Sequence, residues 1–341
     1  MNKKSQNTVT SNLAGYCAND IKSIFLESKS KNIFEDPMLV EKRDIILSSL
    51  KQGNFVLEYQ PKVSIIPKTL GKVTGLEALV RLKIDDQLIS PYHFIDFCER
   101  SKLIVTLGDY LLEQAAKDMK QWEKMGAILV PCSLNVTREQ LIPRNRIALG
   151  TNFNGSYSSY LSEVTPSHTI LEHIEKVSKH YDLPNSIFEL ELIERDTAGS
   201  IDERISFEEL TPILNQIKNN GYLLSIDDYG RGSHNINTLR SGVFDYLKID
   251  REETSQIPIH LMSHATVWDP RVFNDFLHYS SNYNLSTVVE GVESKEQLDF
   301  LRVLDFNNRK FDAVQGYYFS KPLSADKVPK VLAPGYFKDK F

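Results

Sequence analysis

The sequence predicts an α/β protein whose main domain is a closed (β/α)8 barrel with a short helical extension before it. Two observations predict this fold. Eight short apolar or β-branched runs alternate with longer amphipathic stretches, which is typical of a largely parallel sheet covered by helices. Nearly every run also carries a polar or charged residue inside it or at its carboxyl end, whereas buried barrel strands normally read as continuous Val, Ile and Leu. A TIM-like barrel with a polar mouth accounts for both observations.

The elements follow in order. A short helix is predicted over 18–28, and Asp36-Pro37 reads as an N-cap and first-turn proline of a helix that ends at Gly53. We therefore expect a helical extension over 1–50 and a barrel domain over 51–335. The predicted strands are 55–63, 73–82, 131–136, 188–194, 223–229, 246–250, 286–292 and 311–319. The predicted helices are 92–99, 107–125, 170–181, 207–220, 272–283 and 295–304, several of which end at Gly or Asn.

Three segments depart from a regular barrel. A short Gly-containing link over 67–72 leads from the first strand to the second, which favours an antiparallel pair. Residues 143–168 are rich in Gly, Ser, Asn and Tyr, which predicts an inserted loop between two strands. Residues 251–271 are predicted to be irregular.

Composition excludes several classes of protein. Of the 341 residues, 41% are hydrophobic and 25% charged, as in soluble globular proteins. The net charge of −5 does not favour bulk nucleic acid or an anionic membrane, and no apolar run reaches the ~18–20 residues of a membrane span. Three widely spaced cysteines without CxxC spacing, Cys17, Cys98 and Cys132, predict inert thiols in a reducing cytoplasm.

The polar residues of the strands predict a single site. The carboxyl ends of barrel strands form the active-site face, so we expect these side chains to converge there. A buried charge is costly unless it is paired or bound to a metal. The residues are Gln60, Glu77, Asn135, Glu194, Asp227, Asp228, Lys248, Glu290 and Gln315.

The donor types indicate a divalent cation. Clustered carboxylates repel one another, and oxygen ligation without Cys or His favours Mg²⁺ or Mn²⁺ over Zn²⁺. The adjacent Asp227 and Asp228 suggest two ions with a bridging carboxylate, an arrangement suited to transfer of a phosphoryl group to water. Taken singly, an acidic residue at a strand end is more often a helix cap or part of a surface ion pair. Lys248 alone would more often be an ion-pair partner, and the two glutamines alone would mostly face solvent.

Residues 50–332 resemble the EAL domain of bacterial cyclic di-GMP phosphodiesterases. The resemblance covers most of the chain and rests on an ordered set of short blocks. These blocks are Tyr-Gln-Pro at 59–61, Glu-Ala-Leu-Val-Arg at 77–81, Ser-Leu-Asn-Val at 133–136, Glu-Leu-Ile-Glu at 191–194, Ile-Asp-Asp-Tyr-Gly at 226–230, Lys-Ile-Asp at 248–250, Glu-Gly-Val-Glu at 290–293 and Gln-Gly-Tyr-Tyr-Phe at 315–319, followed by Pro322.

The resemblance implies an enzyme that hydrolyses cyclic di-GMP to linear pGpG with Mg²⁺ or Mn²⁺, as a homodimer. It implies a first metal held by Glu77, Asn135, Glu194 and Asp227, and a second held by Asp227, Asp228 and Glu290. Lys248 would orient or activate the attacking water, with Gln315 nearby. Substrate contacts are implied for Gln60, Leu79, Arg81, Asp250 and Pro322, and supporting contacts for Asp250 and Glu293.

Two departures keep other functions open. After Asp228 the chain reads Tyr-Gly-Arg-Gly-Ser-His-Asn, where the family usually has a Ser-rich loop that links dimer contacts to metal binding, and Leu82 replaces the usual Trp. A catalytically weak or inactive receptor for cyclic di-GMP, or a protein-interaction module, is therefore the alternative. Hydrolysis of another phosphodiester also stays open. Residues 1–50 match no sensory module, and no recognition-helix pattern supports DNA binding.

Overall fold

The computed structural model describes residues 16–26, 38–142, 169–193, 207–229, 236–257 and 271–341. The chain is organised as two compact units. One contains the described residues among 1–56 and 80–111, and the other contains those among 57–79, 112–152 and 167–341. Within the described ranges, no helix combines the length and apolar character needed to cross a membrane. The domain limits at 50 and 335 stay a prediction.

The first unit has an apolar core of its own. It contains α1 (Ala18–Leu26), α2 (Leu39–Gln52), β3 (Gln87–Ile89), α3 (Ile95–Arg100) and the start of α4 (Leu103–Lys124). Buried side chains of these elements form one cluster, in which the rings of Phe25 and Phe97 meet edge to face at 5.6 Å. Both predicted helices of the extension are present, although Asp36-Pro37 lies outside the described residues.

Eight of the described strands close a barrel, whose residues belong to the second unit except for the start of β1 and the end of β2. Their order around the barrel is β1 (Phe55–Ser64), β2 (Val73–Ile84), β4 (Cys132–Val136), β5 (Phe188–Ile193), β6 (Leu223–Tyr229), β7 (Tyr246–Ile249), β8 (Ser286–Val289) and β9 (Ala313–Val314). All neighbours from β2 to β9 run parallel, whereas β1 is antiparallel to β9. An antiparallel first strand was predicted, but with β2 rather than β9 as its antiparallel partner. The β1–β2 pairing closes the ring; beside it the Ser64 N–H donates to the Lys72 carbonyl at 2.8 Å.

The last predicted strand is much shorter than its apolar run. The chain leaves β9 after Val314 and turns against the backbone of Val292, whose N–H donates to the Gln315 carbonyl at 3.0 Å. A Cβ on residue 316 would collide with the Val292 backbone, so only glycine fits there. This close approach holds Gln315 at the mouth of the barrel.

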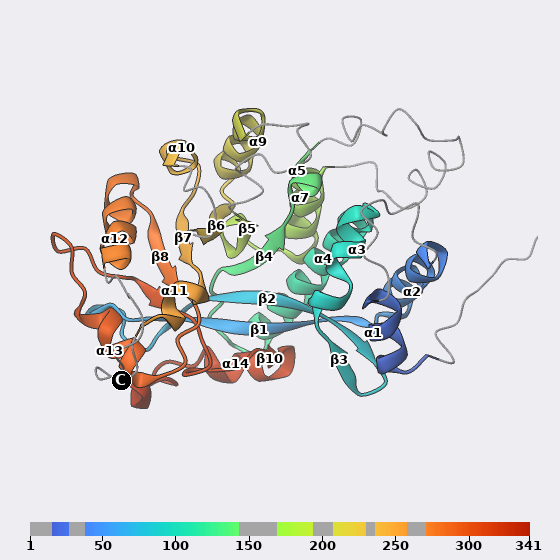
Figure 1. The fold of residues 1–341 in the computed structure, drawn as a ribbon, viewed down its shortest axis with the longest axis horizontal. Helices are drawn as coiled ribbons and strands as arrows, with labels where there is room; N and C mark the ends of the chain where they lie inside the picture. Colours follow the sequence, from blue (N-terminus) through green and yellow to red (C-terminus); the bar gives the residue numbers. More distant parts are fainter. Residues whose placement is uncertain (1–15, 27–37, 143–168, 194–206, 230–235, 258–270) are drawn as a thin grey trace, which may run out of the picture. The chain divides into compact units, whose positions relative to one another are not determined.

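The helices of the second unit lie outside the ring of strands (Figure 1). α7 (Ile170–Tyr181), α9 (Phe207–Asn219), α12 (Arg271–Tyr283) and α13 (Lys295–Val303) agree with prediction to within one residue at each end. The prediction of an irregular 251–271 was wrong at its start, because α11 (Arg251–Ser255) begins there, with the Asp250 carboxylate accepting from the Glu252 N–H at 2.6 Å. Also not predicted were β10 (Leu323–Ser324), α5 (Arg138–Leu141), α10 (Ile236–Arg240) and α14 (Val328–Val331). The insertion at 143–168 lies outside the described residues.

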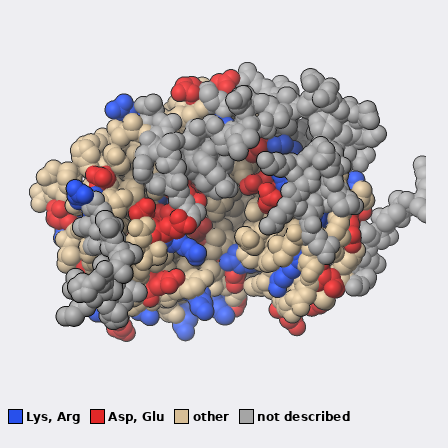
Figure 2. Space-filling view, in the orientation of Figure 1, with Lys and Arg blue, Asp and Glu red and all other residues tan. Residues whose placement is uncertain are grey.

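The visible surface has a mixed charge. Figure 2 shows acidic and basic side chains interspersed over one face of the molecule. The three cysteines carry no disulfide; Cys98 and Cys132 are buried and Cys17 is exposed.

Candidate active site

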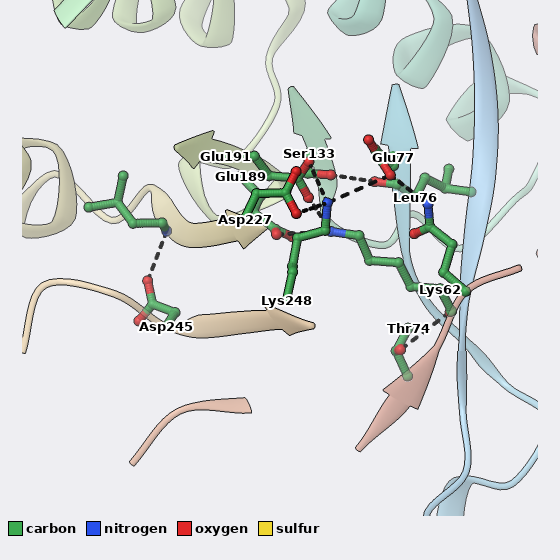
Figure 3. A network of polar contacts seen from close by, with 12 residues as sticks. Lys62, Thr74, Leu76, Glu77, Ser133, Glu189, Glu191, Asp227, Asp245 and Lys248 are labelled. Carbon is green, nitrogen blue, oxygen red and sulfur yellow. Dashed lines mark hydrogen bonds and ion pairs between the residues drawn. The ribbon is translucent and has the colours of Figure 1, made fainter. Parts of the chain in front are cut away.

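A buried lysine lies at the centre of the candidate site. The Lys248 side chain on β7 is fully buried, and its Nζ lies 2.7 Å from Glu290 Oε1, 3.0 Å from Glu191 Oε2 and 3.1 Å from Asp227 Oδ1. Glu77 Oε2 is 3.7 Å away. Figure 3 shows the ammonium group among the carboxylates that come from β2, β5 and β6. The four acids come from four different places in the sequence, so only barrel closure brings them together.

The strand register explains this convergence. Glu77 is paired with Ser133 across β2 and β4, and Asn135 is paired with Glu191 across β4 and β5. Glu290 follows β8 directly, and its N–H donates to the Ile249 carbonyl at 2.9 Å. The carboxyl ends of these parallel strands therefore present their side chains at one end of the barrel, as the sequence predicted.

A second lysine lies beside this group, on the antiparallel strand. The Lys62 Nζ is 2.9 Å from Glu189 Oε1 and 2.9 Å from Glu191 Oε1. Figure 3 shows its side chain extending from β1 toward these two carboxylates of β5. Five carboxylates, counting Glu77, Asp227 and Glu290, thus face two ammonium groups, and five minus two leaves three acids in excess.

Burial and neighbouring charges shift the pKa values of this cluster in opposite directions. Burial raises the pKa of Glu77 and Asp227, and raises the pKa of Glu290 well above its ordinary value, despite the opposing effect of Lys248. Burial also acts to raise the pKa of Glu191, but Lys248 and Lys62 outweigh it and hold that pKa at about 2. Glu191 is therefore the firmly ionised member of the group.

Two glutamines connect the cluster to the loop after β9. The Gln315 amide donates to Glu77 Oε2 at 2.5 Å and to Gln60 Oε1 at 3.2 Å. The Gln60 amide in turn donates to the Ser320 carbonyl at 3.2 Å. Both glutamines are buried, so this chain of hydrogen bonds fixes Glu77 relative to a loop that leads to Pro322.

Two more predicted ligands lie next to the cluster. The Asn135 amide donates to Glu77 Oε1 at 3.3 Å. Asp228 has a φ of +53°, and its N–H donates to Asp227 Oδ1 at 2.9 Å. A positive φ is unusual for a residue other than glycine, and Asp228 adopts it directly after the buried candidate ligand Asp227.

Other predicted residues have different surroundings. Asp250 is buried and caps α11, whereas Glu293 is exposed. Arg81 belongs to the first unit, where its guanidinium donates to the Val80 carbonyl, and Leu79 and Pro322 are half-buried. Glu194 lies outside the described residues.

The sequence interpretation missed three members of the cluster, namely Lys62, Glu189 and Glu191. It considered mainly the ends of strands. The available signal was alternation. Gln60 and Lys62 on β1, like Glu189 and Glu191 on β5, lie two positions apart and so share a face of their strand.

The donor set fits a hard divalent cation. In the described part of the chain, His, Cys, Asp and Glu side chains do not form a preassembled group of three around a metal position. The carboxylates instead surround the Lys248 ammonium. Carboxylate and amide oxygens are nevertheless the donors that Mg²⁺ and Mn²⁺ prefer, and the excess of buried acids favours further positive charge.

Comparison with known proteins identifies the family. Residues 43–322 match the EAL domain family. The probable cyclic di-GMP phosphodiesterase PdeN of Escherichia coli is 28% identical over 293 residues, which cover 85% of this chain and 48% of PdeN. The cyclic di-GMP phosphodiesterase NbdA of Pseudomonas aeruginosa is 28% identical over 290 residues, 83% of this chain and 31% of NbdA. The chain thus spans less than half the length of these relatives.

Solved structures share the fold. The PaMucR phosphodiesterase in its c-di-GMP complex superimposes with a TM-score of 0.66 at 24% identity, over 84% of this chain and 99% of that one. The FimX EAL domain from Pseudomonas aeruginosa bound to c-di-GMP gives a TM-score of 0.63 at 15% identity, over 84% and 97%. The family match over most of the chain, together with the barrel and its polar mouth, shows that this chain belongs to the EAL domain family.

Proposed function

We propose that this protein hydrolyses one phosphodiester bond of cyclic di-GMP to give linear pGpG, and that it needs Mg²⁺ or Mn²⁺ to do so. One observation carries the proposal: a fully buried lysine lies within 3.7 Å of four carboxylates at the mouth of the barrel. The names of PdeN and NbdA, which are cyclic di-GMP phosphodiesterases or probable ones, support the choice of substrate.

The metal ligands that we propose follow from these contacts. Glu77, Asn135, Glu191 and Asp227 would hold one ion, and Asp227, Asp228 and Glu290 a second. Glu191 enters this set because it contacts Lys248 directly, whereas the sequence interpretation had assigned the role to Glu194. When bound, such ions neutralise phosphate oxygens and lower the pKa of a bound water.

Lys248 would act as a charged donor. Its neighbouring carboxylates outweigh burial and raise its pKa well above the ordinary value, so it stays protonated at neutral pH and does not serve as a base. We infer that it orients the attacking water and stabilises negative charge that develops on the phosphate. Gln315 would hold Glu77 in place beside it.

The remaining contacts in this proposal concern the rest of the substrate and the assembly. Gln60 and Pro322 would line a guanine site, with Arg81, Leu79 and Asp250 as further substrate contacts and Glu293 as an outer support. We also infer a homodimer from the resemblance of the sequence blocks to the family. A cytoplasmic location follows from the cysteine pattern, and the net charge and apolar runs favour neither membrane nor nucleic-acid partners.

The experiment is a turnover assay with a binding assay beside it. Purified protein is incubated with cyclic di-GMP in Mg²⁺, in Mn²⁺ and in a chelator, and the products are separated by chromatography. We expect pGpG with either metal and none in the chelator. Calorimetric binding of cyclic di-GMP without turnover in both metals would instead identify a receptor and reject the proposal.

A further inference from the structure

The Lys62–Glu189 ion pair is buried beside the candidate active site. Lys62 and Glu189 are at most 3% exposed, and their charged atoms are 2.9 Å apart. Neither residue is among the proposed ligands. A buried pair of this kind does not by itself make a protein more stable, because desolvation offsets the attraction, so its presence calls for another reason.

Lys62 also contacts Glu191, and it does so at the oxygen that Lys248 does not use. Lys62 Nζ lies 2.9 Å from Glu191 Oε1, whereas Lys248 Nζ lies 3.0 Å from Glu191 Oε2. The two oxygens of one fully buried carboxylate are thus held by two different ammonium groups. This fixes the plane of the carboxylate, with Oε1 on Lys62 and Oε2 on Lys248.

The neighbouring strand leaves room for the Lys62 side chain. A Cβ on residue 75 would lie 3.1 Å from Lys62 Cδ and 3.4 Å from the Pro131 carbonyl oxygen. Gly75 on β2 therefore lets the aliphatic part of Lys62 lie flat against the strand. Three strands thus place Lys62 against Glu191: β1 carries the lysine, β2 leaves space for its side chain, and β5 carries the glutamate.

We propose that Lys62 is a positioning residue for Glu191: it engages Oε1, so that Oε2 alone faces the metal position at the barrel mouth, and Glu189 balances the charge that Lys62 brings. This inference rests on the proposed function, because Glu191 is there a metal ligand. Residues that orient a metal ligand typically change metal affinity or activity by about 10–100-fold when they are replaced.

The test separates positioning from a purely structural ion pair. In the double variant K62M/E189L both charges are replaced by apolar side chains, a change that is often neutral or stabilising for a buried pair. The matched control Glu189→Gln removes one charge and keeps Lys62 in contact with Glu191. Mn²⁺ alone is the probe, its affinity is measured by calorimetry, and thermal unfolding confirms that each protein is folded.

We expect K62M/E189L to bind Mn²⁺ about 10–100-fold more weakly than the unmodified protein, and Glu189→Gln to bind it nearly as well. Equal or tighter binding by the folded double variant overturns the positioning role and leaves the proposed function standing. If the unmodified protein binds no Mn²⁺, the metal-dependent function and the inference fail together.

A second variant decides the matter if K62M/E189L does not fold. Gly75→Ala keeps every charge but places a Cβ 3.1 Å from Lys62 Cδ, so we expect the Lys62 side chain to shift and its contact with Glu191 to weaken. We expect weaker Mn²⁺ binding in the same direction. Unchanged Mn²⁺ affinity in folded Gly75→Ala would contradict the inference.

Discussion

Lys248 Nζ lies 2.7 Å from Glu290 Oε1, which links β7 to the residue that directly follows β8. The same ammonium group contacts Glu191 and Asp227, so one cation holds together acids from several strands. It keeps mutually repelling carboxylates at short distances, and in the described part of the chain only Glu191 among them has a second ammonium group, that of Lys62, at 2.9 Å. This relationship makes the site sensitive to the loss of a single positive charge.

Replacing Lys248 by Met should therefore affect both stability and activity. The loss of one partner from a buried ion pair leaves carboxylates uncompensated, and we expect the free energy of unfolding without metal to fall by about 3–5 kcal/mol. Turnover of cyclic di-GMP should fall by at least about 10²-fold, because a charged donor at the phosphate is lost. Denaturant unfolding and product assays measure the two effects.

The control for this variant is Lys295→Met. Lys295 forms an exposed ion pair with Asp299 at 2.7 Å, and such pairs contribute about 0–1 kcal/mol. Normal turnover in Lys248→Met would reject the role that we propose for this lysine.

Replacing Glu77 by Gln should abolish the response to metal while leaving the fold intact. Both Glu77 oxygens accept hydrogen bonds, from Asn135 and Gln315, and a glutamine can offer an acceptor to only one of them. We expect turnover to fall at least about 10²-fold and the stabilisation by Mn²⁺ to disappear in thermal unfolding. Exposed Glu123→Gln, in contrast, should keep both properties. Full Mn²⁺ stabilisation of Glu77→Gln would show that Glu77 is not a ligand.

The stabilising effect of metal should increase with pH. Burial raises the pKa of Glu77, Asp227 and Glu290, so the folded protein keeps protons that the unfolded chain has lost. Their contribution to stability is complete below the unfolded values of 4.5 for Glu and 3.8 for Asp, and it is lost as pH rises through the raised folded-state values. Metal ions and protons compete for the same oxygens.

We accordingly expect saturating Mg²⁺ to raise the melting temperature more at about pH 8 than at about pH 5, when melting is followed with and without metal. Equal shifts at the two pH values would mean that these carboxylates do not bind the metal.

Replacing Gln60 by Ala should weaken substrate binding more than catalysis. Gln60 connects Gln315 to the Ser320 carbonyl, close to the proposed guanine site, so its loss leaves the buried Gln315 amide and the partly buried Ser320 carbonyl without this partner. We expect a stability loss of about 1–3 kcal/mol and a KM for cyclic di-GMP that rises more than kcat falls. Steady-state kinetics measure both constants.

The neighbouring Tyr59 supplies the matched control. It is fully buried, and its hydroxyl donates to Asp118 on α4 at 2.7 Å, away from the cluster. Tyr59→Phe should cost a similar amount of stability, about 1–3 kcal/mol, with KM unchanged. A change in kcat alone for Gln60→Ala would argue against a guanine site beside this glutamine.

Most of the barrel could be predicted because each strand and helix carries a local signal. The helix over 170–181 was predicted at its exact bounds, since a Thr169 capping box begins it and its apolar face has a helical period. The short β9 could not be predicted. The strand ends where Gly316 packs against the Val292 backbone. This is a tertiary contact, which the apolar run at 311–319 does not indicate.

The meeting of the candidate site's residues was predicted only in part, and the chemistry assigned to them stays a prediction. Glu77, Asp227, Lys248 and Glu290 were expected to meet, and they do. Glu191 was missed because it stands within a strand rather than at its end. Lys62 was missed because β1 runs antiparallel to β9. The rule used in the prediction, that active-site residues lie at the carboxyl ends of parallel strands, does not apply to this strand.

The most direct measurement is the product formed from cyclic di-GMP by the purified protein in Mn²⁺, with Lys248→Met assayed in parallel. We predict conversion to linear pGpG by the unmodified protein and its loss in the variant. Cyclic di-GMP that is bound but recovered unchanged from the unmodified protein, in Mn²⁺ and in Mg²⁺ alike, would contradict the proposed hydrolysis.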